Sequence, residues 1–175
     1  FFPLAGPQGY INLLKAGKRK EAYEIIAEKN PLITVCGYIC HHPCEEVCKR
    51  GTLVDEPMKI RSLKRYLGEI FLDDPPAAYP KLHDLHIAVI GAGPAGLTAA
   101  HCLAKKGYKV TVFDQSGEPG GMLMRGIPDF RLNKQDARRE MERLAKAGIR
   151  FEFNAKLDPA DLDDMLKHYD RIVVA

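Results

Sequence analysis

The sequence predicts a mixed α/β chain in which a helical first half is followed by a half where strands and helices alternate. Three observations support this prediction. Apolar residues recur at helical spacing before residue 72, strand and helix patterns alternate after residue 84, and prolines and acidic residues interrupt both patterns in between. Strands that alternate with helices are typical of a parallel sheet with crossover helices. We therefore expect a helical domain at residues 1–72, a linker at 73–84 and a Rossmann-like domain at 85–175.

Composition limits the classes of protein to which the chain can belong. With 175 residues, of which 46% are hydrophobic, it can bury one ordinary core or two small ones. No stretch approaches the ~20 apolar residues that a bilayer span needs, and the N-terminal segment lacks the pattern of an export signal. The net charge of +3 arises from 26 basic and 23 acidic residues mixed along the chain, so no basic patch indicates a nucleic-acid partner. We expect a cytoplasmic chain without a membrane span.

Helical spacing of apolar residues predicts three helices in the first half. They are expected at residues 8–16, 18–29 and 58–71. A cysteine-rich segment, residues 36–48, lies between the second and the third. The helical half is therefore expected to be built around the cysteines.

Short apolar runs and helix signals alternate in the second half. Strands are expected at residues 85–90, 108–113, 149–153 and 171–175, and helices at residues 94–106 and 132–147. Asp158 is expected to cap a short helix that begins at Pro159. Because the last strand runs into the final residue, we expect a fragment or the product of a split gene, with a truncated second domain.

A G-x-G-x-x-G motif at residues 91–96 follows the first expected strand and opens the first expected helix. An acidic residue, Asp114, ends the next strand. In such a motif Gly91 permits a tight turn, Gly93 lets a pyrophosphate approach the backbone and Gly96 lets the helix lie close to the sheet. The free N–H groups at the helix start face the phosphates. The context predicts a dinucleotide site, and the alternative is a glycine turn in a βαβ unit without a nucleotide.

Neighbouring residues indicate which dinucleotide is bound. Asp114 can accept hydrogen bonds from a ribose diol, and its charge would repel a 2′-phosphate, so NADP is disfavoured here and FAD or NAD remains. The pair Gly120 and Gly121 leaves room for a longer ligand, and Arg131 adds a positive charge. Both features favour FAD. The alternative is that the glycine pair makes an ordinary turn and that Arg131 is a surface cation.

Four of the five cysteines recur at every fourth residue. They are Cys36, Cys40, Cys44 and Cys48. On an unbroken helix the four thiols would form one stripe with neighbours about 6 Å apart, and could not converge on one atom. We expect Gly37 and Pro43 to break the helix, so that the segment wraps around a metal centre.

Three interpretations of this segment remain open. Thiolates are the usual ligands of a [4Fe–4S] cluster, and this interpretation is favoured. Zinc held by cysteine and histidine is the second, although the usual long insert between cysteine pairs is missing. A core stripe of free cysteines is the third. The fifth cysteine, Cys102, is expected to pack in the core behind the glycine motif.

The order of cysteine segment, linker and glycine motif resembles the family of the glutamate synthase small subunit. Relatives include the N-terminal part of dihydropyrimidine dehydrogenase and the NADPH-binding subunit of electron-bifurcating transhydrogenases. The resemblance is carried by residues 30–32, 36–48, 55–57, 63–66, 91–96 and 127–132. It implies an NAD(P)H-dependent oxidoreductase in which hydride passes to FAD, and electrons pass singly through two [4Fe–4S] clusters to a partner redox subunit or domain.

The resemblance also implies site residues. Cys40 and Cys44 match ligands of one cluster, Cys48 matches a ligand of the other, and Cys36 matches a cysteine that need not be a ligand. The positions that match cofactor-binding residues are Gly91, Ala92, Gly93, Pro94, Ala95, Gly96, Asp114, Gln115, Gly121, Met122, Arg131 and Leu157.

Three departures from the family pattern limit what the chain can do alone. The family's other cysteines precede residue 1, and its NAD(P)H-binding domain follows residue 175. Lys64 stands where some relatives offer a glutamine or glutamate as a fourth ligand, and an ammonium group cannot serve as one. We thus expect an electron-transfer flavoprotein module with no catalytic acid or base, because the hydride chemistry belongs to the cofactors. The alternatives are a non-catalytic adaptor and a zinc-stabilised docking module.

Overall fold

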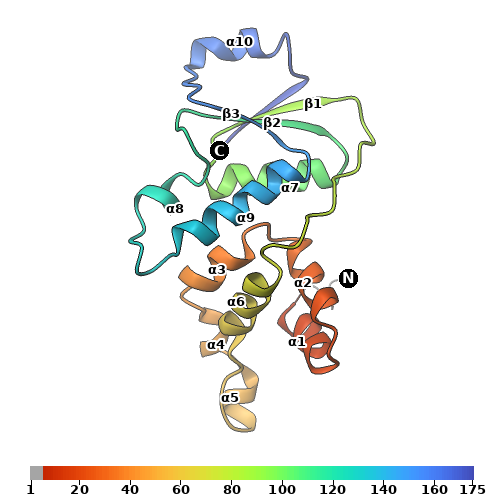
Figure 1. Ribbon diagram of the computed structural model, residues 1–175, viewed down its shortest axis with the longest axis vertical. Coiled ribbons are helices and arrows are strands. Elements are labelled where there is room, and N and C mark those ends of the chain that lie inside the picture. Colours follow the sequence, from red (N-terminus) through yellow and green to blue (C-terminus); the bar gives the residue numbers. More distant parts are fainter. Residues whose placement is uncertain (1–5) are drawn as a thin grey trace.

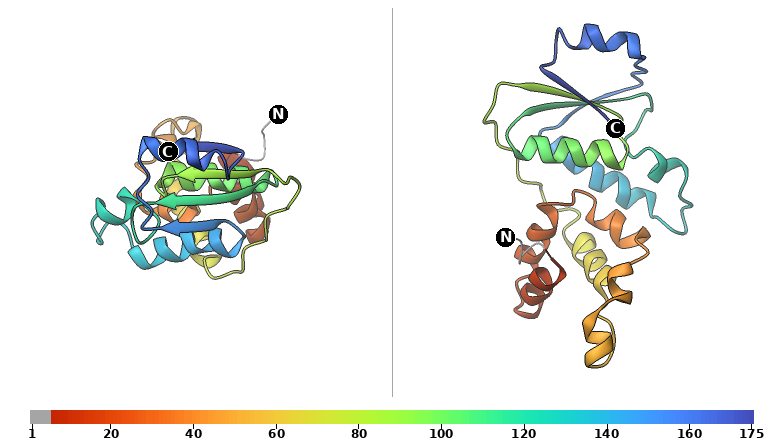
Figure 2. Two further views of the ribbon diagram at one scale, coloured as in Figure 1. Left: turned by 90° about the horizontal axis from the view of Figure 1, so that it is seen from above. Right: turned by 180° about the vertical axis from the view of Figure 1, so that it is seen from behind.

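The computed structural model describes residues 6–175, in which a helical half stands beneath a sheet-containing half (Figure 1). The helices of the first half are α1 (Pro7–Lys15), α2 (Arg19–Ala27), α3 (Ile33–Ile39), α4 (Pro43–Glu46), α5 (Lys49–Leu53) and α6 (Ile60–Ile70). In the two side views α5 lies farthest from the sheet, and α4 precedes it in the chain (Figure 2). The cysteine segment therefore runs from the boundary between the halves to the far tip.

The second half contains a four-stranded parallel sheet with the order β3-β2-β1-β4. Its strands are β1 (His86–Ile90), β2 (Lys109–Asp114), β3 (Arg150–Phe153) and β4 (Arg171–Val174). Helices α7 (Pro94–Lys105) and α9 (Lys134–Lys146) cover the sheet face that is turned toward the helical half (Figure 1). Three shorter elements are α8 (Met122–Arg125), the 3₁₀-helix η1 (Pro159–Asp161) and α10 (Leu162–Met165). The mixed α/β class with a parallel sheet is confirmed.

Two apolar cores hold the molecule together. The smaller lies among α1, α2, α3 and α6 and includes Tyr10, Ile33 and Leu67. The larger lies between the sheet and helices α7 and α9, and it also contains Leu32 and Val35 from the helical half. Because side chains of the first half are buried in the core of the second, the two halves pack as one body.

The periodic helices and strands agree with the sequence predictions to within about two residues at their ends. The expectation that Gly37 breaks the cysteine segment is wrong, because Gly37 lies inside α3. A Cβ atom at Gly37 would lie 2.6 Å from the Cα atom of Arg65, so glycine is needed there for α6 to approach α3. The helix ends instead at Cys40, and His42 adopts a left-handed conformation with φ of 51° before Pro43 begins α4.

The expectation that Cys102 packs in the core is also wrong, because its side chain is exposed. Leu97, Ala100 and Ala104 form the buried face of α7. Cys102 lies two residues from both alanines and therefore points to the opposite side of the helix. Within residues 6–175, no helix combines the length and the apolar character needed to cross a membrane.

Candidate functional site

The glycine loop connects the carboxyl end of β1 to the start of α7. Gly91 has φ of 105°, a conformation that side chains rarely adopt, and a Cβ atom at Gly96 would overlap the carbonyl oxygen of Gly91. At Gly93, in contrast, an added Cβ would meet nothing within 4 Å. Gly91 is thus required by the turn and Gly96 by the close packing of the helix. Gly93 borders open space where a ligand can approach.

The start of α7 is suited to an anionic group. Gly93 is the N-cap residue, Pro94 occupies the first turn, and the first turn contains no acidic residue. A helix N-terminus carries unsatisfied N–H groups and a partial positive charge, which together bind phosphate. The loop can therefore hold the pyrophosphate of a dinucleotide.

Asp114, at the end of β2, is tied to the glycine loop. Its carboxylate accepts hydrogen bonds from the backbone N–H of Ala92 at 2.6 Å and of Ser116 at 2.8 Å. Burial raises the pKa of Asp114, but these hydrogen bonds and the nearby charge of Arg125 outweigh burial and hold the pKa below its usual value. The carboxylate is therefore ionised and fixed, and its remaining lone pairs can accept from ribose hydroxyls.

The second glycine pair packs directly against the first loop. The N–H of Gly120 donates to the carbonyl oxygen of Ala92 at 2.7 Å, and a Cβ at Gly121 would lie 3.2 Å from the Cα of Gly93. Both glycines have positive φ, 114° and 51°. A ligand on the glycine loop would thus be next to Gly121 and the start of α8.

The remaining residues expected at the cofactor site differ in exposure. Met122, which begins α8, is exposed, as are Gln115 and Arg131, whereas Leu157 is half-buried. Sequence reasoning missed Arg125, whose guanidinium donates to the Ser116 hydroxyl, and Lys134. The ammonium of Lys134 donates to the carbonyl oxygens of Leu123 and Ile127 and so fixes the segment that follows Gly121.

The four clustered cysteines are unpaired and half-buried. They lie in α3, at the C-cap of α3, in α4 and at the N-cap of α5, in chain order. The sulfur of Cys40 accepts from the N–H of His42 at 3.3 Å, and that of Cys48 from the N–H of Met58 at 3.5 Å. The bond from Met58 and further backbone N–H groups lower the pKa of Cys48, whereas burial raises the pKa of Cys36.

The donor chemistry of this segment fits thiolate ligation, but the thiols do not form one cage. N–H groups that donate to sulfur stabilise thiolates and tune iron–sulfur clusters. In the part of the chain that the structure describes, however, no three His, Cys, Asp or Glu side chains are grouped to hold a metal ion. Each thiol can therefore serve as a thiolate ligand, but the four do not form a complete cage among residues 6–175.

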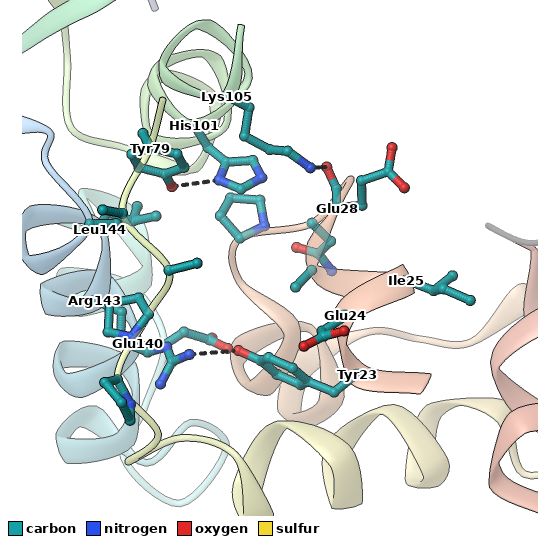
Figure 3. A pocket seen from close by; sticks show the side chains of 18 of the residues that line it. Tyr23, Glu24, Ile25, Glu28, Tyr79, His101, Lys105, Glu140, Arg143 and Leu144 are labelled. Carbon is teal, nitrogen blue, oxygen red and sulfur yellow. Dashed lines mark hydrogen bonds between the residues drawn. The ribbon is translucent and has the colours of Figure 1, made fainter. Parts of the chain in front are cut away.

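A separate cavity of about 770 Å³ lies at the boundary between the halves, lined by α2, the proline-rich linker, α7 and α9 (Figure 3). The hydroxyl of Tyr79 lies 2.7 Å from Nδ1 of His101, and burial lowers the pKa of His101. Sequence analysis did not single out these residues. No local sequence pattern predicts this cavity, because its wall is formed by segments that are far apart in the chain.

Two protein-family models match the chain, one in each half. Residues 6–74 match the family described as dihydropyrimidine dehydrogenase domain II, 4Fe-4S cluster, and residues 89–134 match the NAD(P)-binding Rossmann-like domain. The beta subunit of NADP(+)-dependent formate dehydrogenase from Moorella thermoacetica is 36% identical over 95% of the chain, which covers 27% of that relative.

Two further relatives agree with this result. The small chain of NADPH glutamate synthase from Escherichia coli is 35% identical over 93% of this chain, which covers 36% of that protein. The beta subunit of NADPH-Fe(3+) oxidoreductase from Geobacter sulfurreducens is 32% identical over 95% of this chain, which covers 25% of that protein. The chain thus spans about a quarter to a third of the length of these relatives. It is a homologue of the glutamate synthase small chain, with one segment that matches the dihydropyrimidine dehydrogenase-type 4Fe-4S family and another that matches the NAD(P)-binding Rossmann-like family.

Proposed function

We propose that this chain is the flavin- and cluster-binding module of an NAD(P)H-dependent oxidoreductase in the cytoplasm, which passes electrons through FAD and 4Fe-4S clusters to a partner redox subunit. One observation carries the proposal. A glycine loop with an open phosphate position and a cysteine segment of the 4Fe-4S type are held in a single packed body. Four unpaired thiols support the location, because the reducing cytoplasm keeps thiols free.

FAD is the dinucleotide that these residues suit best. The fixed negative charge of Asp114 beside the loop disfavours a 2′-phosphate and therefore NADP. The contact of Gly121 with Gly93 supports a ligand that continues from the pyrophosphate toward α8. Residues 91–96, with Arg131 and Leu157 farther along the chain, complete the proposed FAD-binding set.

The chain's own residues bind and orient the cofactors. Bound FAD would supply a two-electron acceptor for the hydride of NAD(P)H and a one-electron donor to the clusters, with the one proton of that hydride released to solvent. The start of α7 neutralises the pyrophosphate, and Asp114 fixes the ribose. Cys40 and Cys44 would ligate one cluster and Cys48 another, with Cys36 as a further candidate. NAD(P)H would bind to a domain outside this chain.

Cofactor analysis of the anaerobically prepared full-length protein tests the proposal. We expect FAD, iron and acid-labile sulfide, with little zinc. Zinc without sulfide would indicate the zinc-stabilised docking module instead, and clusters without flavin would contradict the role of the glycine loop.

One cysteine variant and a matched control test whether Cys48 is a cluster ligand. Because the sulfur of Cys48 accepts an N–H bond and has a lowered pKa, we expect Cys48→Ser to lose iron and to change the electron paramagnetic resonance (EPR) spectrum of the reduced protein. Cys102→Ser is the matched control, because Cys102 is exposed on α7, and it should retain full iron content. Equal iron content in both variants would remove Cys48 from the ligand set.

A further inference from the structure

Helix α9 of the sheet-containing half reaches across the boundary with a buried carboxylate. Glu140 is 3% exposed and accepts hydrogen bonds from the backbone N–H of Thr34 at 2.7 Å and of Val35 at 2.9 Å. These two N–H groups belong to the first turn of α3. An anionic side chain at this position satisfies N–H groups that have no partner within the helix and complements the helix dipole.

One turn farther along α9, Arg143 makes the complementary contact. Its guanidinium donates to the carbonyl oxygens of Phe71 at 2.9 Å and Leu72 at 2.8 Å, just beyond the end of α6, and also to that of Asp74. A cation at a helix C-terminus is favoured by the helix dipole. The guanidinium also donates to the hydroxyl of Tyr23 at 3.1 Å (Figure 3). A single helix thus places a carboxyl group on the start of α3 and a cation on the end of α6.

Helices α3 and α6 form an antiparallel pair with little space between them. A Cβ added at Gly37 would overlap the backbone of Arg65, and one added at Gly68 would lie 2.6 Å from the hydroxyl of Thr34. The guanidinium of Arg61 donates to the carbonyl oxygen of Cys40 at 3.1 Å. The pair therefore has one end at α9 and carries Cys40 at its other end, about 10 Å away for a helix as short as α3, whereas Cys36 directly follows Val35.

The beginning of α9 is anchored beside the glycine loops. Asn133 caps the helix by accepting from the N–H groups of Gln135 and Asp136, and Lys134 holds the carbonyl oxygens of Leu123 and Ile127. Figure 1 shows α9 running from the neighbourhood of α8 to the boundary with α3. One continuous helix therefore contacts both the segment after Gly121 and the helices that carry cysteines.

We propose that Glu140 and Arg143 are positioning residues that set the distance between the flavin and the nearest cluster. This inference rests on the proposed function. Electron transfer slows steeply as the gap between two cofactors grows, and neither side chain is among the residues proposed to hold the cofactors. Loosening the contact at the start of α3 is expected to shift α3 and its C-cap Cys40 relative to the glycine loop, while the proposed cofactor-binding residues stay the same.

Single-turnover kinetics on the anaerobic, cofactor-loaded full-length protein test the inference. In Glu140→Gln one of the two N–H acceptors is lost while the shape is kept. We expect NAD(P)H to reduce the flavin at the wild-type rate and the following reduction of the clusters to be slower, by up to the ~100-fold that a misplacement of about 1 Å can cost. Cofactor content and the cluster EPR spectrum should be unchanged, and the amides of Thr34 and Val35 should exchange hydrogen faster. Glu142→Gln, an exposed change on the same helix, should match wild type in every measurement.

The outcomes separate this inference from the proposed function. Faster amide exchange with an unchanged flavin-to-cluster rate would overturn the positioning role, and so would an equal slowing of both steps. Should Glu140→Gln fail to fold, Arg143→Lys provides the same test, since it keeps the charge but cannot hold all of the carbonyl oxygens. A wild-type protein without flavin or clusters would instead contradict the proposed function.

Discussion

At the residue scale, Asp114 ties the glycine loop to the end of β2. Its carboxylate joins Ala92 of the loop to Ser116, which follows β2. The same carboxylate is the group proposed to bind the ribose. Fold stability and the proposed ligand binding are therefore both expected to depend on one side chain.

Replacing Asp114 by alanine tests this double role. We expect Asp114→Ala to lose about 1–3 kcal/mol of unfolding free energy, because two backbone N–H groups lose their acceptor. The variant should also retain less FAD. Urea unfolding and flavin content measure the two effects, with Asp114→Asn as the variant that keeps one acceptor. Wild-type flavin content in the alanine variant would exclude Asp114 from the cofactor site.

A second prediction at this scale concerns the pH dependence of stability. Burial raises the pKa of Glu140 to about 7, although the N–H groups of Thr34 and Val35 and the charge of Arg143 act in the opposite direction. In the unfolded chain the carboxyl loses its proton at lower pH, so the folded protein holds more protons between about pH 4.5 and 7. This group therefore makes the free energy of unfolding fall as pH rises through that window. Glu140→Gln should lack this contribution, and parallel stability curves for the two proteins would contradict the raised pKa.

At the element scale, the helices with full apolar stripes were predictable and the short ones were not. The apolar spacing in α6 and α9 located these helices to within about two residues. The four- and five-residue helices α4, α5 and α8 are too short to contain a repeating stripe. Gly37 was wrongly expected to break the helix. Glycine is needed there because the backbone of α6 passes too close to α3 for any side chain.

Replacing Gly37 by alanine separates helix propensity from packing. Propensity alone predicts that Gly37→Ala stabilises α3 by up to about 1 kcal/mol. The close approach of Arg65 predicts the opposite sign, with a loss of about 1–3 kcal/mol typical of overpacked sites. We expect the loss in urea unfolding. Gly117→Ala is the control, because its Cβ would meet only the side-chain oxygen of Asn154 at 3.5 Å, and a stabilised Gly37→Ala would contradict the packing.

At the scale of the whole molecule, the halves are joined more tightly than the sequence indicated. The prolines and acidic residues of 73–84 predicted a linker, yet the N–H of Tyr79 donates to the carbonyl oxygen of Ala147 and those of Leu82 and His83 to Gly107. Glu140 contacts residues more than 100 positions away. No local pattern reveals such pairs, so the motifs of the site could be predicted from the sequence but the connection between them could not.

The most direct test of the central claim is rapid mixing of the anaerobic full-length protein with NADPH or NADH, followed by absorbance and freeze-quenched EPR. We predict that flavin absorbance is lost first and that the signal of reduced clusters rises afterwards, at the rate at which the flavin gives up electrons. A flavin that one of the two nucleotides reduces but that never passes electrons to the clusters would contradict the claim, as would clusters that are reduced before the flavin.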